Sequence, residues 1–222
     1  MLEVQGLHVA IGSVTVLRGF SMDVPTASMV GLVGRNGAGK TTLMRALMGH
    51  LPVTQGRVLL NGEDLLALPP HLRAARGIGY MPEDRGLVPE LTVEENILVP
   101  LWASRTLGLE NRLSLVYSVL PELLEMRSRR ALLLSGGQQK LVALARALAA
   151  GTRLLLLDEP FEGVAPALSK RLAEVIASLK DGQLSVLIAQ SDLNHATRIV
   201  DREFVIERGG NVSEAAQASL MP

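Results

Sequence analysis

The 222-residue sequence has no cysteine, few aromatic residues and no excess of charge of either sign. The lack of cysteine excludes disulfides, thiolate catalysis and cysteine-ligated zinc, and it is compatible with a reducing compartment. Basic and acidic residues both number 22, so the formal net charge is zero. This balance, together with 3% aromatic residues, does not match the basic and aromatic surface of a nucleic-acid groove. We therefore expect no nucleic-acid partner.

Long hydrophobic runs are also missing. No apolar stretch approaches the roughly 20 residues that span a bilayer, and the N-terminus lacks the basic-then-apolar pattern of a signal peptide. Hydrophobic residues nevertheless make up 48% of the chain, and the mean hydropathy is +0.28. This excess suggests apolar surface that is covered by another protein, although a large core rich in leucine and alanine explains it equally well.

Residues 34–41 read GRNGAGKT and match the pattern GxxxxGK[ST] between an apolar run and a helix-favouring stretch. In such a phosphate loop the backbone N–H groups surround the phosphates, Lys40 reaches the β- and γ-phosphates, and the Thr41 hydroxyl ligates Mg²⁺. The helix that follows aims its N-terminal dipole at the same anion. The nucleotide-binding residues expected here are Gly34, Arg35, Asn36, Gly37, Ala38, Gly39, Lys40, Thr41 and Thr42.

The remaining pattern predicts an α/β fold of the P-loop NTPase class, with an N-terminal antiparallel β region, a parallel-sheet core and a helical subdomain. Residues 7–11 and 14–17 predict antiparallel strands around a turn at Gly12. Further strands are expected at 57–60, 78–81, 153–157, 185–189 and 203–207. Helices are expected at 42–48, 70–76, 138–149, 167–180 and 194–200.

The stretch from residue 91 to 149 differs from its surroundings because it is largely helical. Thr92 and Glu95 have the spacing of a capping box, which marks a helix start. We expect one domain over 1–222, in which residues 1–90 and 150–210 form the β-rich core and residues 91–149 form the helical subdomain. The tail at 213–222 is expected to be a short helix or a frayed end.

Asp158 and Glu159 directly follow the unbroken apolar run at 154–157, which is typical of a central strand buried on both faces. Ligands bind at that end of a parallel sheet. Asp158 would hold Mg²⁺, and Glu159 would polarise the water that attacks the γ-phosphate. An Asp-Glu-Pro sequence alone is more often a helix cap and turn, but the phosphate loop reverses this preference.

A second candidate anion site lies at residues 134–139, which read LSGGQQ. Without other signals, an ordinary serine N-cap is the better explanation. A chain with two phosphate-binding helix starts and one metal site suggests that the second start serves the nucleotide of a different subunit. The residues expected to do so are Ser135, Gly136, Gly137 and Gln138.

Together, the motifs at 34–41, 134–139 and 154–160 resemble those of the ATP-binding subunit of an ABC transporter, and the resemblance covers essentially the whole chain. It implies a RecA-like core and a head-to-tail dimer that sandwiches two ATP molecules. It also implies a peripheral subunit on the cytoplasmic face of the inner (plasma) membrane. This subunit would hydrolyse ATP with Mg²⁺ and drive separate transmembrane permease subunits.

Two finer segments resemble the ATPases of branched-chain amino acid uptake systems and of their urea and short-amide relatives. These segments are residues 80–96, YMPEDRGLVPELTVEEN, and residues 161–166, FEGVAP. The implied function is solute import, in which a solute-binding protein takes part indirectly. Neither the solute nor the choice between a homodimer and a heterodimer follows from the sequence.

Three positions depart from the pattern of the family. Ile11 stands where most members have an aromatic residue that stacks on adenine, so adenine should be held by van der Waals contact only. Glu83 replaces a glutamine that links Mg²⁺ to the transporter interface, and it is a charged oxygen donor. Ser191 replaces the switch histidine that contacts the γ-phosphate; it can donate one hydrogen bond, and Gln190 could add another. Slower hydrolysis, or the weaker site of an unequal pair, would follow.

Three alternatives remain open. Ile11 and Ser191 would suit a regulatory subunit with low turnover. A non-transport ABC ATPase is disfavoured because the chain has neither a tandem cassette nor a coiled-coil insertion, and a lipopolysaccharide-export ATPase is similar in size.

His8, His50 and His71 lack metal-ligand spacing. His195 is expected at a helix surface, and Trp102 and Tyr117 in the core or facing a partner.

Overall fold

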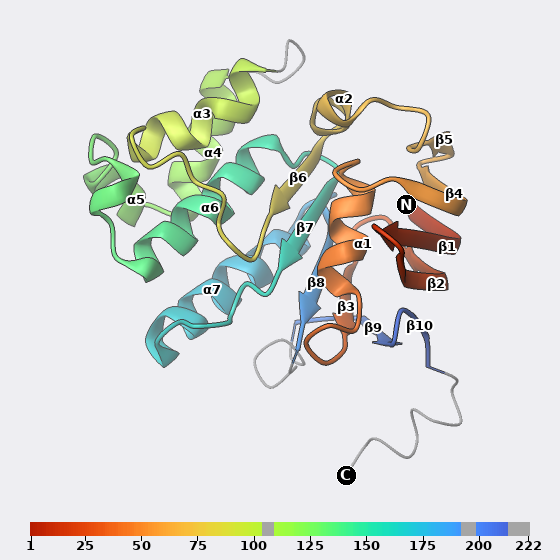
Figure 1. Cartoon of the computed structure of the whole chain (residues 1–222). Helices are drawn as coiled ribbons and strands as arrows, with labels where there is room; N and C mark the ends of the chain where they lie inside the picture. The colour runs from red at the N-terminus through yellow and green to blue at the C-terminus, as the bar shows by residue number, and fades with distance from the viewer. Residues whose placement is uncertain (104–108, 192–198, 213–222) are drawn as a thin grey trace.

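The computed structural model describes residues 1–103, 109–191 and 199–212 (Figure 1). The helix expected near 194–200 lies mostly outside the described residues. His195 and the tail at 213–222 lie entirely outside them. Among the described residues, no helix has both the length and the apolarity that crossing a membrane requires.

The N-terminal region forms a four-stranded antiparallel sheet in the order β2-β1-β4-β5. Strands β1 (Leu2–Ile11) and β2 (Val14–Val24) join at the turn around Gly12, which confirms the predicted hairpin. The sheet is completed by β4 (Val53–Leu60) and the short β5 (Glu63–Asp64). Strand β4 begins four residues before the expected start, because β1 offers a pairing partner as far as Val9.

The second sheet has six strands in the order β10-β9-β3-β8-β7-β6, and all neighbours are parallel except β9 and β10. Its strands are β3 (Met29–Val33), β6 (Ile78–Met81), β7 (Leu154–Asp158), β8 (Ser185–Gln190), β9 (Arg202–Glu207) and β10 (Gly210–Asn211). Val33 lies opposite Gln190, and Asp158 lies opposite Ala189. The carboxyl ends of β3, β7 and β8 therefore meet at one edge.

Helix α1 (Lys40–Leu47) lies between the two sheets and contacts strands of both (Figure 1). Its apolar side chains, including Leu43 and Met44, join one buried cluster with Leu154 and Leu156 of β7. Leu155 and Leu157 of β7 point to the other face and belong to a second cluster. The strand is thus buried on both faces, which explains its unbroken apolar run.

The second cluster is covered by helices. Helices α3 (Val93–Trp102), α6 (Gly136–Ala150) and α7 (Pro166–Ser178) contribute buried side chains to it. The remaining helical elements are α2 (Pro70–Ala75), α4 (Leu109–Val119), α5 (Glu122–Glu125) and the 3-10 turns Ala131–Leu133 and Leu179–Asp181. In Figure 1, α3, α4 and α5 lie together on the far side of α6 from the N-terminal sheet.

The start of α3 confirms the predicted capping box. The Thr92 hydroxyl accepts the Glu95 N–H, and the Glu95 carboxylate accepts the Thr92 N–H. Trp102 ends this helix with 55% of its surface exposed, so the option of a core position is wrong for this residue. Tyr117 is half-buried, and its hydroxyl donates to Glu94 (2.8 Å).

Candidate nucleotide-binding and hydrolysis site

The candidate site lies at the edge where three parallel strands end. The phosphate loop follows β3, the acidic pair Asp158 and Glu159 closes β7, and Ser191 follows β8. The parallel register brings these three segments together although the phosphate loop is more than 100 residues from the other two in sequence. The sheet thus assembles the predicted site residues without any need for sequence proximity.

Lys40 is the centre of the site. Its ammonium donates to the carbonyl oxygens of Gly34 (2.5 Å) and Arg35 (3.3 Å) and to the Ser191 hydroxyl (3.2 Å). It also forms an ion pair with Glu159 at 3.1 Å, in which the side chains of Lys40 and Glu159 are 5% and 4% exposed. A buried pair of this kind is stable only while both partners are present, because removing either would leave an uncompensated charge.

Ser191 connects the groups around Lys40. Its hydroxyl lies within hydrogen-bond distance of Asn36 Oδ1 (2.6 Å) and also contacts a Glu159 carboxylate oxygen, and its N–H donates to Glu159 (3.1 Å). A hydroxyl has one proton and accepts through its lone pairs. Ser191 can therefore accept from Lys40 while it donates to either Asn36 or Glu159, but not to both.

Glu159 adopts an uncommon backbone conformation with φ of 48°, in the left-handed region. Its N–H donates to the Ala189 carbonyl (2.9 Å), which fixes the peptide against β8. Non-glycine residues in this region store strain, and they are frequent at functional sites. The conformation turns the chain sharply after β7, and the Glu159 carboxylate meets Lys40.

Asp158 is fully buried, and neither of its carboxylate oxygens has a hydrogen-bond partner among the described residues. Burial raises the pKa of Asp158 to about 6, and the charges of Glu83 and Glu159 add to the rise. The Thr41 hydroxyl and Lys40 oppose the shift, although the hydroxyl is not in hydrogen-bonding geometry with the carboxylate.

Two unpartnered carboxylate oxygens beside a threonine hydroxyl fit the oxygen ligands that Mg²⁺ prefers. No group of three or more histidine or acidic side chains in the described part of the chain could hold a metal ion by itself. Mg²⁺ does not require such a group, because it usually takes one or two protein ligands together with waters and substrate phosphates.

A cavity of about 370 Å³ opens over this cluster. Its lining comprises Val16, Asn36, Gly37, Gly39, Lys40, Thr41, Thr42, Glu83 and Glu159. Ile11, the expected adenine contact, does not line this cavity and is 49% exposed at the end of β1. Val16 lines it instead, and the sequence analysis missed this residue because an alternating valine in a strand has no distinctive signal.

The phosphate loop is held against the β9–β10 turn. Gly209 N–H donates to the Ala38 carbonyl (2.9 Å), and the Gly209 carbonyl accepts from Arg18 N–H (2.8 Å). A Cβ atom on Gly209 would lie 1.7 Å from the Val16 carbonyl oxygen, and one on Gly34 would lie 2.4 Å from a β9 carbonyl oxygen. Glycine is therefore required at both positions for the loop and the turn to approach this closely.

The LSGGQQ segment does not line the Lys40 cavity. Ser135 caps α6 in a capping box with Gln138: the serine hydroxyl accepts the Gln138 N–H (3.3 Å), and the Gln138 side chain accepts the Ser135 N–H (3.0 Å). Ser135 and Gly136 are exposed. The structure therefore does not bring this predicted anion site to the phosphate loop of the same chain.

Two basic side chains that the sequence analysis did not select hold the LSGGQQ helix. Arg85 donates to the Gln139 side chain (2.8 Å), and its guanidinium lies 3.4 Å from where a Cβ on Gly136 would be. Lys140 is buried and donates to the Glu162 carbonyl, just beyond the acidic pair. Burial lowers the pKa of Lys140, and Arg85 lowers it further. The helix is thus tied both to the segment before α3 and to the loop after β7.

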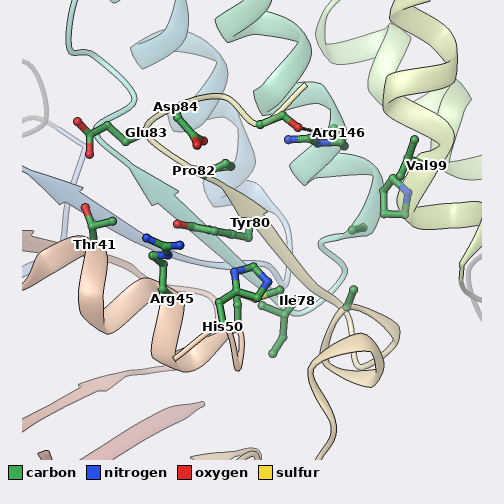
Figure 2. A pocket seen from close by; sticks show the side chains of 15 residues that line it. Thr41, Arg45, His50, Ile78, Tyr80, Pro82, Glu83, Asp84, Val99 and Arg146 are labelled. Carbon is green, nitrogen blue, oxygen red and sulfur yellow. Dashed lines mark hydrogen bonds between the residues drawn. The ribbon is translucent and has the colours of Figure 1, made fainter. Parts of the chain in front are cut away.

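A larger cleft of about 680 Å³ lies beside the site, between α1 and the helices α3 and α6. In Figure 2, Tyr80 extends from β6 with Arg45 and His50 on one side of it and Glu83 and Asp84 on the other. Burial raises the pKa of Tyr80, and burial followed by nearby arginines lowers that of His50. Glu83 lines both this cleft and the Lys40 cavity, so the two are contiguous at its side chain.

A phosphate loop on a parallel sheet, with an acidic pair at the end of a neighbouring strand, defines a P-loop nucleotide hydrolase. The family model described as ABC transporter matches residues 17–162. The chain belongs to this family, which confirms the resemblance and the predicted fold class. It is an ABC ATPase, which binds ATP with Mg²⁺ as the usual ion.

Similar proteins with known names include ATP-binding proteins of two kinds. A high-affinity branched-chain amino acid transport ATP-binding protein of Pseudomonas aeruginosa is 33% identical and matches 100% of this chain and 95% of its own length. A lipopolysaccharide export ATP-binding protein of Haemophilus influenzae is also 33% identical, over 100% of this chain and 92% of its own length.

Solved structures agree with the fold. A nucleotide-free ATP-binding cassette from an ABC transporter superposes with a TM-score of 0.81 at 27% identity, covering 96% of this chain and 90% of its own. The ADP conformation of an ATP-binding cassette of an ABC transporter superposes with a TM-score of 0.81 at 27% identity, covering 96% of this chain and 89% of its own.

Proposed function

We propose that this ABC ATPase powers the import of a branched-chain amino acid, or of urea or a related small amide, through separate transmembrane permease subunits. It would work as a peripheral subunit on the cytoplasmic face of the membrane, and a solute-binding protein would take part indirectly. The proposal includes a single domain over residues 1–222, with a helical subdomain at residues 91–149. The observation that carries the ATPase part is the convergence of Lys40, Glu159 and Ser191 beside the buried Asp158.

In the proposed cycle, the phosphate loop binds the triphosphate through its backbone N–H groups, and Lys40 turns from Glu159 to the β- and γ-phosphates. This exchange releases the Glu159 carboxylate from its ion pair. Glu159 then accepts a proton from the attacking water. Ser191 donates a hydrogen bond to the γ-phosphate through its hydroxyl. This is the role that the resemblance assigns to the switch histidine.

Thr41 and Asp158 would hold Mg²⁺, and Glu83 would reach it from the segment after β6. The metal, when bound, neutralises charge that develops on the transferred phosphoryl group. Asp158 must be ionised to serve as a ligand. The Asp158 carboxylate has a raised pKa and two oxygens without hydrogen-bond partners. A bound cation would stabilise its ionised form and give these oxygens a ligand.

The LSGGQQ segment would act on the nucleotide of a second ATPase subunit, either another copy of this chain or a close relative. Support comes from its placement, since Ser135 and Gly136 are exposed and lie outside the cavity of their own chain. Two chains arranged head to tail would place each Ser135 opposite the partner's phosphate loop. ABC ATPase cassettes as a class dimerise and act with permease subunits.

Support for import comes from the segments at 80–96 and 161–166 and from the named amino-acid transport relatives, which include an Archaeoglobus fulgidus protein 31% identical over 94% of this chain and 89% of its own length. Lipopolysaccharide export is the second candidate, favoured by the equal 33% identity of the Haemophilus influenzae relative. Glu83 lies where the larger cleft meets the nucleotide cavity, and we propose that the permease contacts this cleft.

The decisive experiment deletes the gene in its own host and restores it as wild type or as Glu159→Gln. Uptake of labelled leucine, urea and acetamide is then measured. We expect one of these uptakes to fall on deletion and to return only with the wild-type chain. Unchanged uptake of all three, with lipopolysaccharide accumulating at the inner membrane, would replace import by export.

ATP hydrolysis by the purified chain should be measured in parallel as a function of its concentration, with Glu159→Gln as the blank. A rate that rises faster than linearly would indicate a competent homodimer. A rate equal to the blank would indicate that a different ATPase subunit is required, or that this chain is the low-turnover member of the pair.

A further inference from the structure

We infer that this chain has a second ligand site, which binds a short aliphatic monocarboxylate in an apolar cavity beside Arg112. The cavity measures about 250 Å³ and lies between α4, the end of α6 and the 3-10 turn that follows α7. The inference goes beyond the proposed transport function, and it depends neither on the solute nor on the hydrolysis of ATP.

The cavity lies at the opposite edge of the parallel sheet from the nucleotide site. Two of its lining residues, Gly151 and Thr152, precede β7, and a third, Leu184, precedes β8. The nucleotide site uses the carboxyl ends of the same two strands. None of the residues that line the cavity, all of which the structure describes, lines the Lys40 cavity or the larger cleft. A ligand here would therefore not occupy the space of the nucleotide.

One face of α4 contributes a stripe of side chains to the cavity. They recur at intervals of three and four residues and are those of Arg112, Leu115, Val116 and Val119. The neighbouring elements add further aliphatic side chains, namely those of Leu148, Leu179 and Leu184. Leu115 is 42% exposed, whereas Val116 and Leu148 are buried. The cavity thus extends from the surface into the apolar interior.

Arg112 carries the only charged side chain in the lining of this cavity. Its Nε donates to the Ala149 carbonyl (2.9 Å), and its Nη2 donates to the carbonyls of Leu148 and Gly151. A guanidinium has five N–H groups, and these bonds use the one on Nε and both of those on Nη2. The two N–H groups of Nη1 have no acceptor within the described part of the chain. They remain available to a ligand.

The positive charge of Arg112 also has no anionic partner among the residues that the structure describes. Its three acceptors are carbonyl groups at the end of α6, where the helix dipole favours a cation. Burial lowers the pKa of Arg112, and no nearby carboxylate offsets this shift. The carbonyls hold the guanidinium in place but do not neutralise it. An anionic group at Nη1 would do so through charge-assisted hydrogen bonds.

The lining decides which anion fits. The aliphatic walls favour a hydrocarbon body, and a cavity of roughly 150 Å³ already holds a benzene ring. A second carboxylate on the ligand would be buried against the aliphatic walls without a partner. An ammonium group beside the carboxylate would be repelled by the guanidinium. The class that fits is therefore a monocarboxylate with a short aliphatic chain, such as 4-methylpentanoate.

The test measures dissociation constants for the full chain by ligand-observed NMR, with and without ADP in the Lys40 cavity. We expect 4-methylpentanoate to bind at least about tenfold more tightly than 4-methylpentanamide, because a guanidinium bonds a carboxylate more strongly than a neutral amide. Leucine, which adds an ammonium group to the same carbon skeleton, should be weaker by a similar factor. From butanoate to hexanoate, each added methylene group should tighten binding by about fourfold.

Leu115→Glu is the variant that tests the cavity, because replacing Arg112 itself would leave three carbonyl groups of α6 without their donor. A glutamate at position 115 lies three residues after Arg112 on α4, within reach of its guanidinium. It should weaken the binding of 4-methylpentanoate by at least about tenfold without lowering the thermal unfolding midpoint.

Leu124→Glu is the matched control. Leu124 lies on α5, is 45% exposed and does not line the cavity. The variant adds the same charge to the same subdomain, and it should leave the dissociation constant unchanged.

A wild-type chain that does not bind 4-methylpentanoate, or that binds the amide or leucine equally well, would overturn the inference. So would a Leu115→Glu chain with wild-type affinity, or a loss of affinity equalled by Leu124→Glu. Binding of the acid that ADP abolishes would place the carboxylate at the phosphate loop and would also overturn it. Because uptake is not measured in this experiment, these outcomes are separate from failure of the proposed import.

Discussion

Replacing Ser191 with alanine is the perturbation that most directly probes the site. The Ser191 hydroxyl meets Lys40, Asn36 and Glu159, and it replaces an expected histidine. If it donates one hydrogen bond to the γ-phosphate in the transition state, its loss removes a bond to a charged group, worth ~1.5–3 kcal/mol. At about 1.4 kcal/mol for each tenfold change, kcat should fall by roughly 10- to 150-fold.

Steady-state hydrolysis of Mg²⁺-ATP measures the effect, and the KM should change by less than about threefold, because the interaction is made mainly in the transition state. Ser178→Ala is a suitable control, since the Ser178 hydroxyl donates to the Val175 carbonyl within α7, away from the site. Ser191→His should keep or raise the wild-type rate. A Ser191→Ala enzyme with an unchanged kcat, or with a loss equalled by Ser178→Ala, would refute the reasoning.

Three further perturbations test other parts of the structure. With a pKa of about 6, Asp158 should take up a proton as the pH falls from 7.5 to 5 and weaken Mg²⁺-dependent ATP binding; calorimetry on Asp158→Asn should show weak binding without this pH dependence. Arg85→Gln loses its bond to Gln139, so ATP-induced dimerisation measured by light scattering should weaken by about fivefold while ATP binding to the single chain stays unchanged. Equal weakening of both would contradict this role. Gly209→Ala forces a Cβ to 1.7 Å from a carbonyl oxygen and should lower the free energy of unfolding in urea by ~2 kcal/mol or more; no shift of the midpoint would contradict the close approach.

Much of the fold could be predicted because local patterns report local structure. The alternation around Gly12, the capping box at Thr92 and the unbroken apolar run of β7 each matched the structure. Boundaries were less exact where partners decide them. Strand β4 starts early because β1 extends to meet it, and the regular helix α7 ends at Ser178 before a 3-10 turn. Such limits depend on residues distant in sequence.

The candidate site, like the fold, could be predicted only in part from the sequence. The motifs selected Lys40, Asp158 and Glu159 because phosphate and metal chemistry demands particular residue types at particular spacings. Val16 and Arg85 were missed because a strand valine and a loop arginine acquire a role only from what lies beside them. The structure identifies Val16 by its place in the lining of the Lys40 cavity and Arg85 by its hydrogen bond to Gln139 of the LSGGQQ helix.

The sequence by itself determined the chemical inventory: a phosphate loop, an acidic pair after a buried strand, a serine in place of histidine and no ring near Gly12. Only the tertiary structure decided that Lys40 pairs with Glu159 through Ser191, and that the Asp158 oxygens are buried without partners. The physical reason is that composition and spacing act along the chain, whereas ion pairing, desolvation and cavity shape depend on the order and register in which the parallel strands pair.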